Sequence, residues 1–171
     1  MVRARESRSL PPLPPGTRVA VVVSTYHAEL TGAMAASAGR TLRSANLAAG
    51  NLLEIRVPGA YELPIVARKL AGRDDVHAVL CFGLVLKGET EHDRFIAGAV
   101  AEGLMRVALD REKPVLFGVL TCETLEQAWA RARPREEGGF DKGHEVAAAA
   151  VEVLHSLHRA SQPFGSPEDT P

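Results

Sequence analysis

The chain has 171 residues, of which 46% are hydrophobic and 24% are charged, and its formal net charge is -1. This length allows one domain with a full core and is too short for two ordinary domains. There is no excess of basic residues to neutralise a nucleic-acid backbone, no apolar stretch near the ~20 residues of a membrane span, and no secretory signal at the N-terminus. We therefore expect a cytoplasmic protein with neither nucleic acid nor membrane as a partner.

Both ends of the chain differ in composition from the middle. Residues 1–16 carry three arginines and four prolines and lack any hydrophobic periodicity. They are predicted to be a flexible Pro-rich tail, which could act as a stiff spacer, lie along a neighbouring subunit or dock in an aromatic groove. Residues 161–171 are rich in proline and acid and are predicted to be disordered. Residues 17–160 remain as a single domain.

Short apolar runs alternate with longer helical patterns through this domain. Strands are expected at 18–24, 52–57, 77–82 and 114–120, and helices at 28–49, 62–71, 91–109, 125–133 and 142–158. This order predicts a three-layer α/β fold, in which a parallel sheet of about four strands carries helices on both faces. Ligands of such sheets bind outside the carboxyl ends of the strands.

The most informative of these strand ends is the turn from Lys87 to His92, which reads Lys-Gly-Glu-Thr-Glu-His. Thr90 stands three residues before Asp93, as in a capping box at the start of a helix. A helix start offers free backbone amides to phosphate, and Gly88 allows a ligand to approach the backbone. The turn is interpreted either as a phosphate site with a histidine base or as a well-capped surface helix.

The other strand ends carry weaker signals. Tyr26 could stack on a flat heterocycle or cover the core, and Glu62 could face a ligand or simply begin its helix. Cys81 and Cys122 are predicted to be buried reduced thiols, and His155 and His158 to be solvated. The chain lacks the common nucleotide-binding glycine motifs, a serine elbow and clustered metal ligands. No metal is therefore expected.

Five motifs at these positions resemble the lumazine synthase family over about residues 18–157. They are Val57-Pro58-Gly59-Ala60-Tyr61-Glu62-Leu63-Pro64, Lys87-Gly88-Glu89-Thr90-Glu91-His92, Phe117-Gly118-Val119-Leu120-Thr121, Glu126-Gln127-Ala128 with Arg131, and Asp141-Lys142-Gly143. The resemblance implies a flavodoxin-like sheet and a transferase of riboflavin biosynthesis. The implied reaction joins 5-amino-6-(D-ribitylamino)uracil to 3,4-dihydroxy-2-butanone 4-phosphate, gives 6,7-dimethyl-8-ribityllumazine, phosphate and water, and needs no cofactor.

The resemblance also implies a role for each matching position. His92 would move protons, while the Gly88-Glu89-Thr90 turn and Arg131 would bind phosphate. The pyrimidine and ribityl chain would contact Tyr26, Ala60, Tyr61, Glu62, Leu84, Leu86, Phe117 and Lys142. Phe117 and Lys142 would come from a neighbouring subunit, because the family builds its sites between the subunits of a homopentamer.

Three positions depart from the family pattern: Tyr26, Glu91 and the pair Asp93-Arg94. They leave two other hypotheses open. One is a non-catalytic relative that binds flavin or lumazine, and the other is a flavodoxin-like interaction domain whose Pro-rich tail binds a partner. The stretch between Arg131 and Lys142, which contains Pro134 and Gly138-Gly139, looks somewhat longer than in family members that form sixty-subunit shells, and the resemblance therefore favours a free pentamer.

Overall fold

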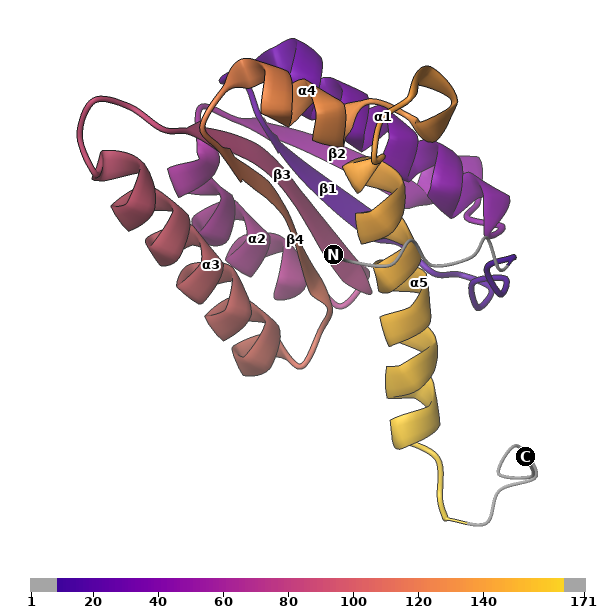
Figure 1. The fold of residues 1–171 in the computed structure, drawn as a ribbon. Helices are drawn as coiled ribbons and strands as arrows, with labels where there is room; N and C mark the ends of the chain where they lie inside the picture. Colours follow the sequence, from indigo (N-terminus) through magenta and orange to yellow (C-terminus); the bar gives the residue numbers. More distant parts are fainter. Residues whose placement is uncertain (1–8, 165–171) are drawn as a thin grey trace.

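The computed structural model describes residues 9–164, in which strands and helices alternate along the chain (Figure 1). The strands are β1 Val19–Ser24, β2 Leu52–Val57, β3 Ala78–Leu86 and β4 Val115–Cys122. The α-helices are α1 Ala28–Ser44, α2 Leu63–Ala71, α3 His92–Arg111, α4 Leu125–Ala132 and α5 Lys142–Ala160. Short 3-10 turns stand at Ala49–Asn51, Ala60–Glu62 and Arg135–Glu137.

The four strands form one parallel sheet in the order β2-β1-β3-β4. Every residue of β1 is buried, as is every residue of β3 before Leu86, because these central strands have a neighbour on each side and helices on both faces. The edge strands β2 and β4 are partly exposed. This order follows the flavodoxin-like pattern, and the predicted three-layer α/β class is confirmed.

Helices cover both faces of the sheet. Figure 1 shows α1, α4 and α5 on one face and α2 and α3 on the other. Successive side chains of β1 alternate between the two cores: Val21 and Val23 lie beneath the first group, and Val22 lies beneath the second. No helix within residues 9–164 has both the length and the apolar character needed to cross a membrane.

The third strand is longer than predicted. Gly83 was expected to end it, but the pairing with β4 continues through Leu86 and Cys122. A Cβ on Gly83 would lie 3.1 Å from a side-chain atom of Leu63 and 3.2 Å from the Cβ of Ala60. The glycine therefore admits the segment before α2 close to the strand and does not mark a turn.

The first helix is shorter than predicted, ending at Ser44 and not near Ala49. Asn46 adopts a left-handed backbone conformation with φ 66°. Its N–H donates to the Arg43 carbonyl, and the Leu47 N–H donates to the Leu42 carbonyl, each at 3.0 Å. This arrangement is a Schellman motif with asparagine in the usual glycine position.

Part of the Pro-rich N-terminal segment packs on the domain. Leu13 is buried, and its N–H donates to the carbonyl of Ala45 at 2.8 Å. The carbonyl of Pro12 lies 3.0 Å from Nε2 of His155 on α5. Residues 9–16, which were expected to be flexible, thus contact α5 and the end of α1. The remainder of this tail, and residues 165–171 of the other, lie outside the described residues.

Candidate active site

A cavity of about 480 Å³ lies at the carboxyl edge of the sheet. It opens between the turn that joins β3 to α3 and the turn that joins β4 to α4. Because parallel strands end at the same edge, turns that are some thirty residues apart in the chain meet here. Its lining residues are Lys87, Gly88, Glu89, Thr90, Glu91, Asp93, Arg94, Thr121, Cys122, Glu123 and Gln127.

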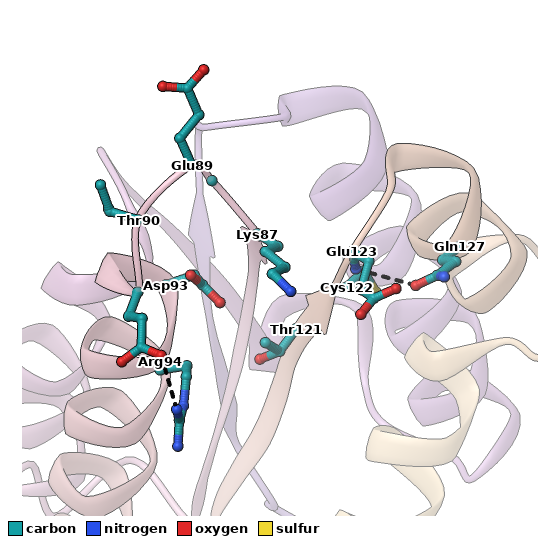
Figure 2. Close-up of a pocket in the computed structure, with 11 residues that line it drawn as sticks. Lys87, Glu89, Thr90, Asp93, Arg94, Thr121, Cys122, Glu123 and Gln127 are labelled. Carbon is teal, nitrogen blue, oxygen red and sulfur yellow. Dashed lines mark hydrogen bonds and ion pairs between the residues drawn. The ribbon is translucent and has the colours of Figure 1, made fainter.

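The charged side chains of this cavity do not all face its interior. Figure 2 shows Lys87 and Asp93 pointing into the cavity, whereas Glu89 points away from it. Glu91 forms an ion pair with Arg94 at 3.3 Å. Lys87 is fixed at the end of β3 because its N–H donates to the Cys122 carbonyl at 2.9 Å. The Lys87 amine therefore brings a positive charge into the cavity, and two of the surrounding acids are turned away or paired.

The helix start at this cavity differs from the prediction. The capping box of Thr90 and Asp93 is wrong: α3 begins at His92, Glu91 occupies the N-cap position, and no side chain caps the helix. The Thr90 hydroxyl instead accepts a long hydrogen bond of 3.4 Å from the His92 N–H. The Arg94 N–H donates to the Glu91 carbonyl at 3.1 Å. The positive end of the α3 dipole still lies at this turn, where it favours an anion.

Gly88 stands in open space within this turn. A Cβ added there would have no atom of the chain within 4 Å. The packing of this chain therefore does not require glycine at position 88. An incoming ligand that contacts the backbone would require it, as would a second copy of the chain.

Arg131 lies beside the cavity, on the last turn of α4. Its guanidinium donates to the carbonyl of Gln127, a lining residue, at 3.0 Å. Burial raises the pKa of the Cys122 thiol, and the positive charge of Arg131 acts in the opposite direction and lowers it. This electrostatic interaction places the Arg131 charge near the end of β4. Of the predicted phosphate residues, Gly88, Glu89 and Thr90 therefore line the cavity, whereas Arg131 lies beside it and does not line it.

His92 lies less close to the cavity than the residues that line it. It is the first residue of α3 and is exposed, and it does not line the cavity, although Glu91 and Asp93 on either side of it do. A histidine here can reach a ligand that sits on the helix start and extends out of the cavity. Asp93, by contrast, is buried, whereas the sequence had indicated it as part of a capping box and as a departure from the family pattern.

The other predicted ligand residues form a second group, at the ends of β1 and β2. The Tyr26 N–H donates to the Pro58 carbonyl at 3.0 Å, and the Tyr26 ring is 71% exposed. Ala60 is buried against Gly83 of β3, and Tyr61 is exposed. One carboxylate oxygen of Glu62 accepts a hydrogen bond of 2.8 Å from the Gly59 N–H. This group is next to the cavity edge because β1 and β3 are neighbours.

Four predicted residues lie elsewhere. Leu84 and Leu86 are on β3, and their backbone positions approach the cavity at the strand end. Phe117 is on the edge strand β4, five residues before Cys122, which is roughly 16 Å along a strand. Lys142 is the first residue of α5, and its amine pairs with Glu145 at 2.7 Å. Neither Phe117 nor Lys142 lines the cavity of its own chain.

Sequence reasoning did not assign several residues that line the cavity. Glu123 and Gln127 are joined by a hydrogen bond of 3.1 Å, from the Glu123 N–H to the Gln127 amide oxygen. Thr124 caps α4 by accepting a hydrogen bond of 3.2 Å from the Gln127 N–H. The pattern Thr-x-x-Gln directly after a strand is the signal that could have located this capped turn. In residues 9–164, no cluster of three or more side chains is arranged to hold a metal ion.

These features define a class of protein. It is a flavodoxin-like α/β protein with a polar cavity at the carboxyl edge of its parallel sheet, next to the start of a helix. The sequence profile of the 6,7-dimethyl-8-ribityllumazine synthase family matches residues 16–158. The chain belongs to this family.

Individual members of the family are similar in sequence to this chain over most of their length. A 6,7-dimethyl-8-ribityllumazine synthase of Stenotrophomonas maltophilia is 43% identical over 148 residues, covering 85% of this chain and 92% of the relative. A protein of the same name from Frankia casuarinae is 46% identical over 154 residues, covering 88% and 93%. One from Streptomyces avermitilis is 42% identical over 147 residues, covering 86% and 89%. The family resemblance drawn from the five motifs is thereby confirmed.

Proposed function

We propose that this protein is a transferase that condenses 5-amino-6-(D-ribitylamino)uracil with 3,4-dihydroxy-2-butanone 4-phosphate to form 6,7-dimethyl-8-ribityllumazine. One observation carries the proposal. In a chain of this family, the Gly88-Glu89-Thr90 turn and the helix that bears Arg131 meet at one cavity, although they are far apart in the sequence. That cavity combines a helix start with the cation of Lys87, and Arg131 supplies a second cation beside it, as a phosphorylated substrate requires.

Each group of residues has a part in this reaction. The phosphate binds to the Gly88-Glu89-Thr90 backbone and to Arg131. The aromatic ring of Tyr26 stacks on the pyrimidine, and the Ala60, Tyr61 and Glu62 segment contacts the ribityl chain. The 5-amino group attacks the ketone, water leaves as the imine forms, and His92 transfers protons as phosphate departs. The enol left by this elimination becomes a second carbonyl, and the ribitylamino nitrogen attacks it and closes the ring with loss of a second water. Much of the acceleration comes from alignment of the amine and the ketone.

A second copy of the chain completes the site. Phe117 is partly exposed on the open edge of β4, and Lys142 lies away from the cavity of its own chain. Both can therefore reach a neighbour's site and not their own. We place the active protein in a homopentamer in the cytoplasm. Sedimentation velocity would detect the pentamer, and a fully active monomer would contradict the shared site.

The assay mixes both substrates with the protein and follows the fluorescence of the lumazine. We expect formation well above the spontaneous rate. No acceleration over the spontaneous rate would overturn the proposal. Tight binding of flavin without turnover would assign the chain to ligand binding in place of catalysis.

Variants separate the phosphate site from general effects. Arg131→Ala should raise the KM for the phosphorylated substrate by about tenfold, because a charge-assisted contact is worth roughly 1.5–3 kcal/mol. Arg43→Ala is the matched control: it removes an exposed arginine from the last turn of α1, and it should leave KM unchanged. His92→Gln should lower kcat with little change in either KM. Equal effects of the two arginine changes would argue against a phosphate role for Arg131.

A further inference from the structure

The junction between α4 and α5 depends on one buried acid. Asp141 is 7% exposed, is the N-cap of α5 and adopts a left-handed conformation with φ 54° and ψ 65°. One carboxylate oxygen, Oδ1, accepts two hydrogen bonds: one of 3.0 Å from the His144 N–H and one of 2.6 Å from the Ser37 hydroxyl. The first begins α5, and the second joins α5 to the middle of α1.

The contact with α1 has a second polar bond one turn further on. The Thr41 hydroxyl lies 2.9 Å from Nδ1 of His144. Ser37 and Thr41 are both buried, at 2% and 6% exposure. Ser37, Thr41, Asp141 and His144 form what we call the Asp141 network. Buried bonds of this kind fix the position of a helix more specifically than apolar packing alone.

The same residue also fixes the return of the chain from α4. The Asp141 N–H donates to the Arg133 carbonyl at 3.0 Å, and the Phe140 N–H donates to the Ala130 carbonyl at 2.9 Å. These two acceptors stand on either side of Arg131. Lys142 follows Asp141 directly and is the first residue of α5. Asp141 is therefore bonded to the backbone on both sides of the junction, close to Arg131 on one side and to Lys142 on the other.

From this geometry we infer that Asp141 is a positioning residue for two substrate-binding cations of the enzyme, Arg131 and Lys142. It does not touch the substrate: its carboxylate is buried between α1 and α5. It holds the end of α4 and the start of α5 in one arrangement, so that Arg131 is presented to the phosphate and Lys142 to the pyrimidine site of a neighbouring subunit in a fixed geometry. The inference rests on the proposed function, which gives these two cations a substrate to bind.

Substitutions at position 141 can separate the effect of losing the carboxylate oxygen from the effect of straining the backbone. Both bonds to Oδ1 come from donors, so the amide oxygen of asparagine can accept them equally well, and asparagine also tolerates the left-handed conformation. Asp141→Asn should therefore keep the network. Asp141→Gly keeps the backbone conformation and loses the acceptor, whereas Asp141→Ala loses the acceptor and strains the backbone. Comparison of the three variants shows whether the acceptor oxygen or the backbone conformation at position 141 is responsible for an effect.

The experiment measures both KM values and kcat of the full-length protein, together with its equilibrium binding of inorganic phosphate by calorimetry. We expect Asp141→Ala and Asp141→Gly to raise the KM for the phosphorylated substrate and the phosphate Kd by about tenfold, since displacements near 1 Å can cost up to a hundredfold. The KM for the pyrimidine should also rise, because Lys142 contacts that substrate in the site of the neighbouring subunit. Asp141→Asn should restore wild-type values.

A matched control separates position from stability. Thr17→Ala removes a buried hydroxyl that donates at 2.7 Å to the Pro14 carbonyl, just before β1 and so at the opposite edge of the sheet from the cavity. It should lower the melting temperature as Ser37→Ala does, and only Ser37→Ala should raise the KM for the phosphorylated substrate, by roughly threefold.

The outcomes separate this inference from the function on which it rests. If Asp141→Gly lowers the melting temperature and leaves both the phosphate Kd and the KM unchanged, the network is structural only and the inference is overturned. If wild type binds phosphate and forms no lumazine, the reaction is wrong while the phosphate titration of the variants still decides the role of Asp141. A wild-type protein that binds no phosphate overturns both.

Discussion

Substitution of Gly143 by alanine tests the closest approach of two helices, α1 and α5. A Cβ on Gly143 would lie 2.8 Å from the Cβ of Ser37 and closer still to the carbonyl oxygen of Met34. The backbone of α1 cannot rotate away as a side chain could, so the two helices must separate. Alanine gains at most about 1 kcal/mol of helix propensity, whereas overpacking costs about 1–3 kcal/mol. With a backbone atom as the obstacle, we expect a net loss of about 2 kcal/mol.

The assay is thermal and urea unfolding at one fixed protein concentration, because subunit association also affects the midpoint. A loss of about 2 kcal/mol should lower the melting temperature by about 4–8 °C for a chain of this size. Gly32→Ala in α1 is the matched control, since a Cβ there meets no atom within 4 Å, and it should be neutral or stabilising by up to about 1 kcal/mol. A Gly143→Ala protein as stable as wild type would refute the reasoning.

Three further predictions test other parts of the fold. Asn46→Ala should destabilise the protein by about 1 kcal/mol because alanine disfavours the left-handed conformation, and Asn46→Gly should not; urea midpoints that fall equally for both would contradict this. Leu104→Ala, at a side chain of α3 that is 1% exposed, should cost about 2–5 kcal/mol in the same assay. The hydrogen bond and charge of Arg73 hold the pKa of Asp75 at about 2. Because the pKa of Asp75 is lower in the folded state, its ionised form stabilises the folded protein fully above the unfolded-state pKa of about 4. This stabilisation is lost as the pH falls toward 2. The stability difference between wild type and Asp75→Asn should therefore shrink from pH 5 to pH 2.5, and a constant difference would count against the pair.

Local patterns predicted the architecture because strand and helix periodicities were clear and most breaks fell at glycine or proline. The errors arose where the role of a residue depends on contact with a segment that is distant in the sequence. Gly83 was interpreted as a strand end because nothing in its neighbourhood indicated that Ala60 and Leu63 would pack against it. Asn46 ended α1 through backbone geometry that asparagine adopts less often than glycine.

The residues of the candidate site were likewise predictable where they are adjacent in the sequence and not where they depend on distant contacts. The turn around Gly88 could be found from sequence because its residues are adjacent, and Arg131 entered only through the family resemblance. The contribution of Gln127 could not be found in this way, since it depends on the β4–α4 turn meeting the β3–α3 turn in space. The depth of Asp93 depends likewise on how α3 is set against the sheet.

The central position of β1 has a consequence for how the chain folds during synthesis. β1 pairs first with β2, which follows it closely in the sequence, but its other edge stays open until Ala78 and the rest of β3 arrive to pair with Val19 and its neighbours. At ~5–20 residues per second, the ribosome would leave this apolar edge uncovered for several seconds. In that interval α1 and α2 can shield only the faces of the strand. The nascent chain should therefore be most prone to aggregation between the emergence of β2 and that of β3.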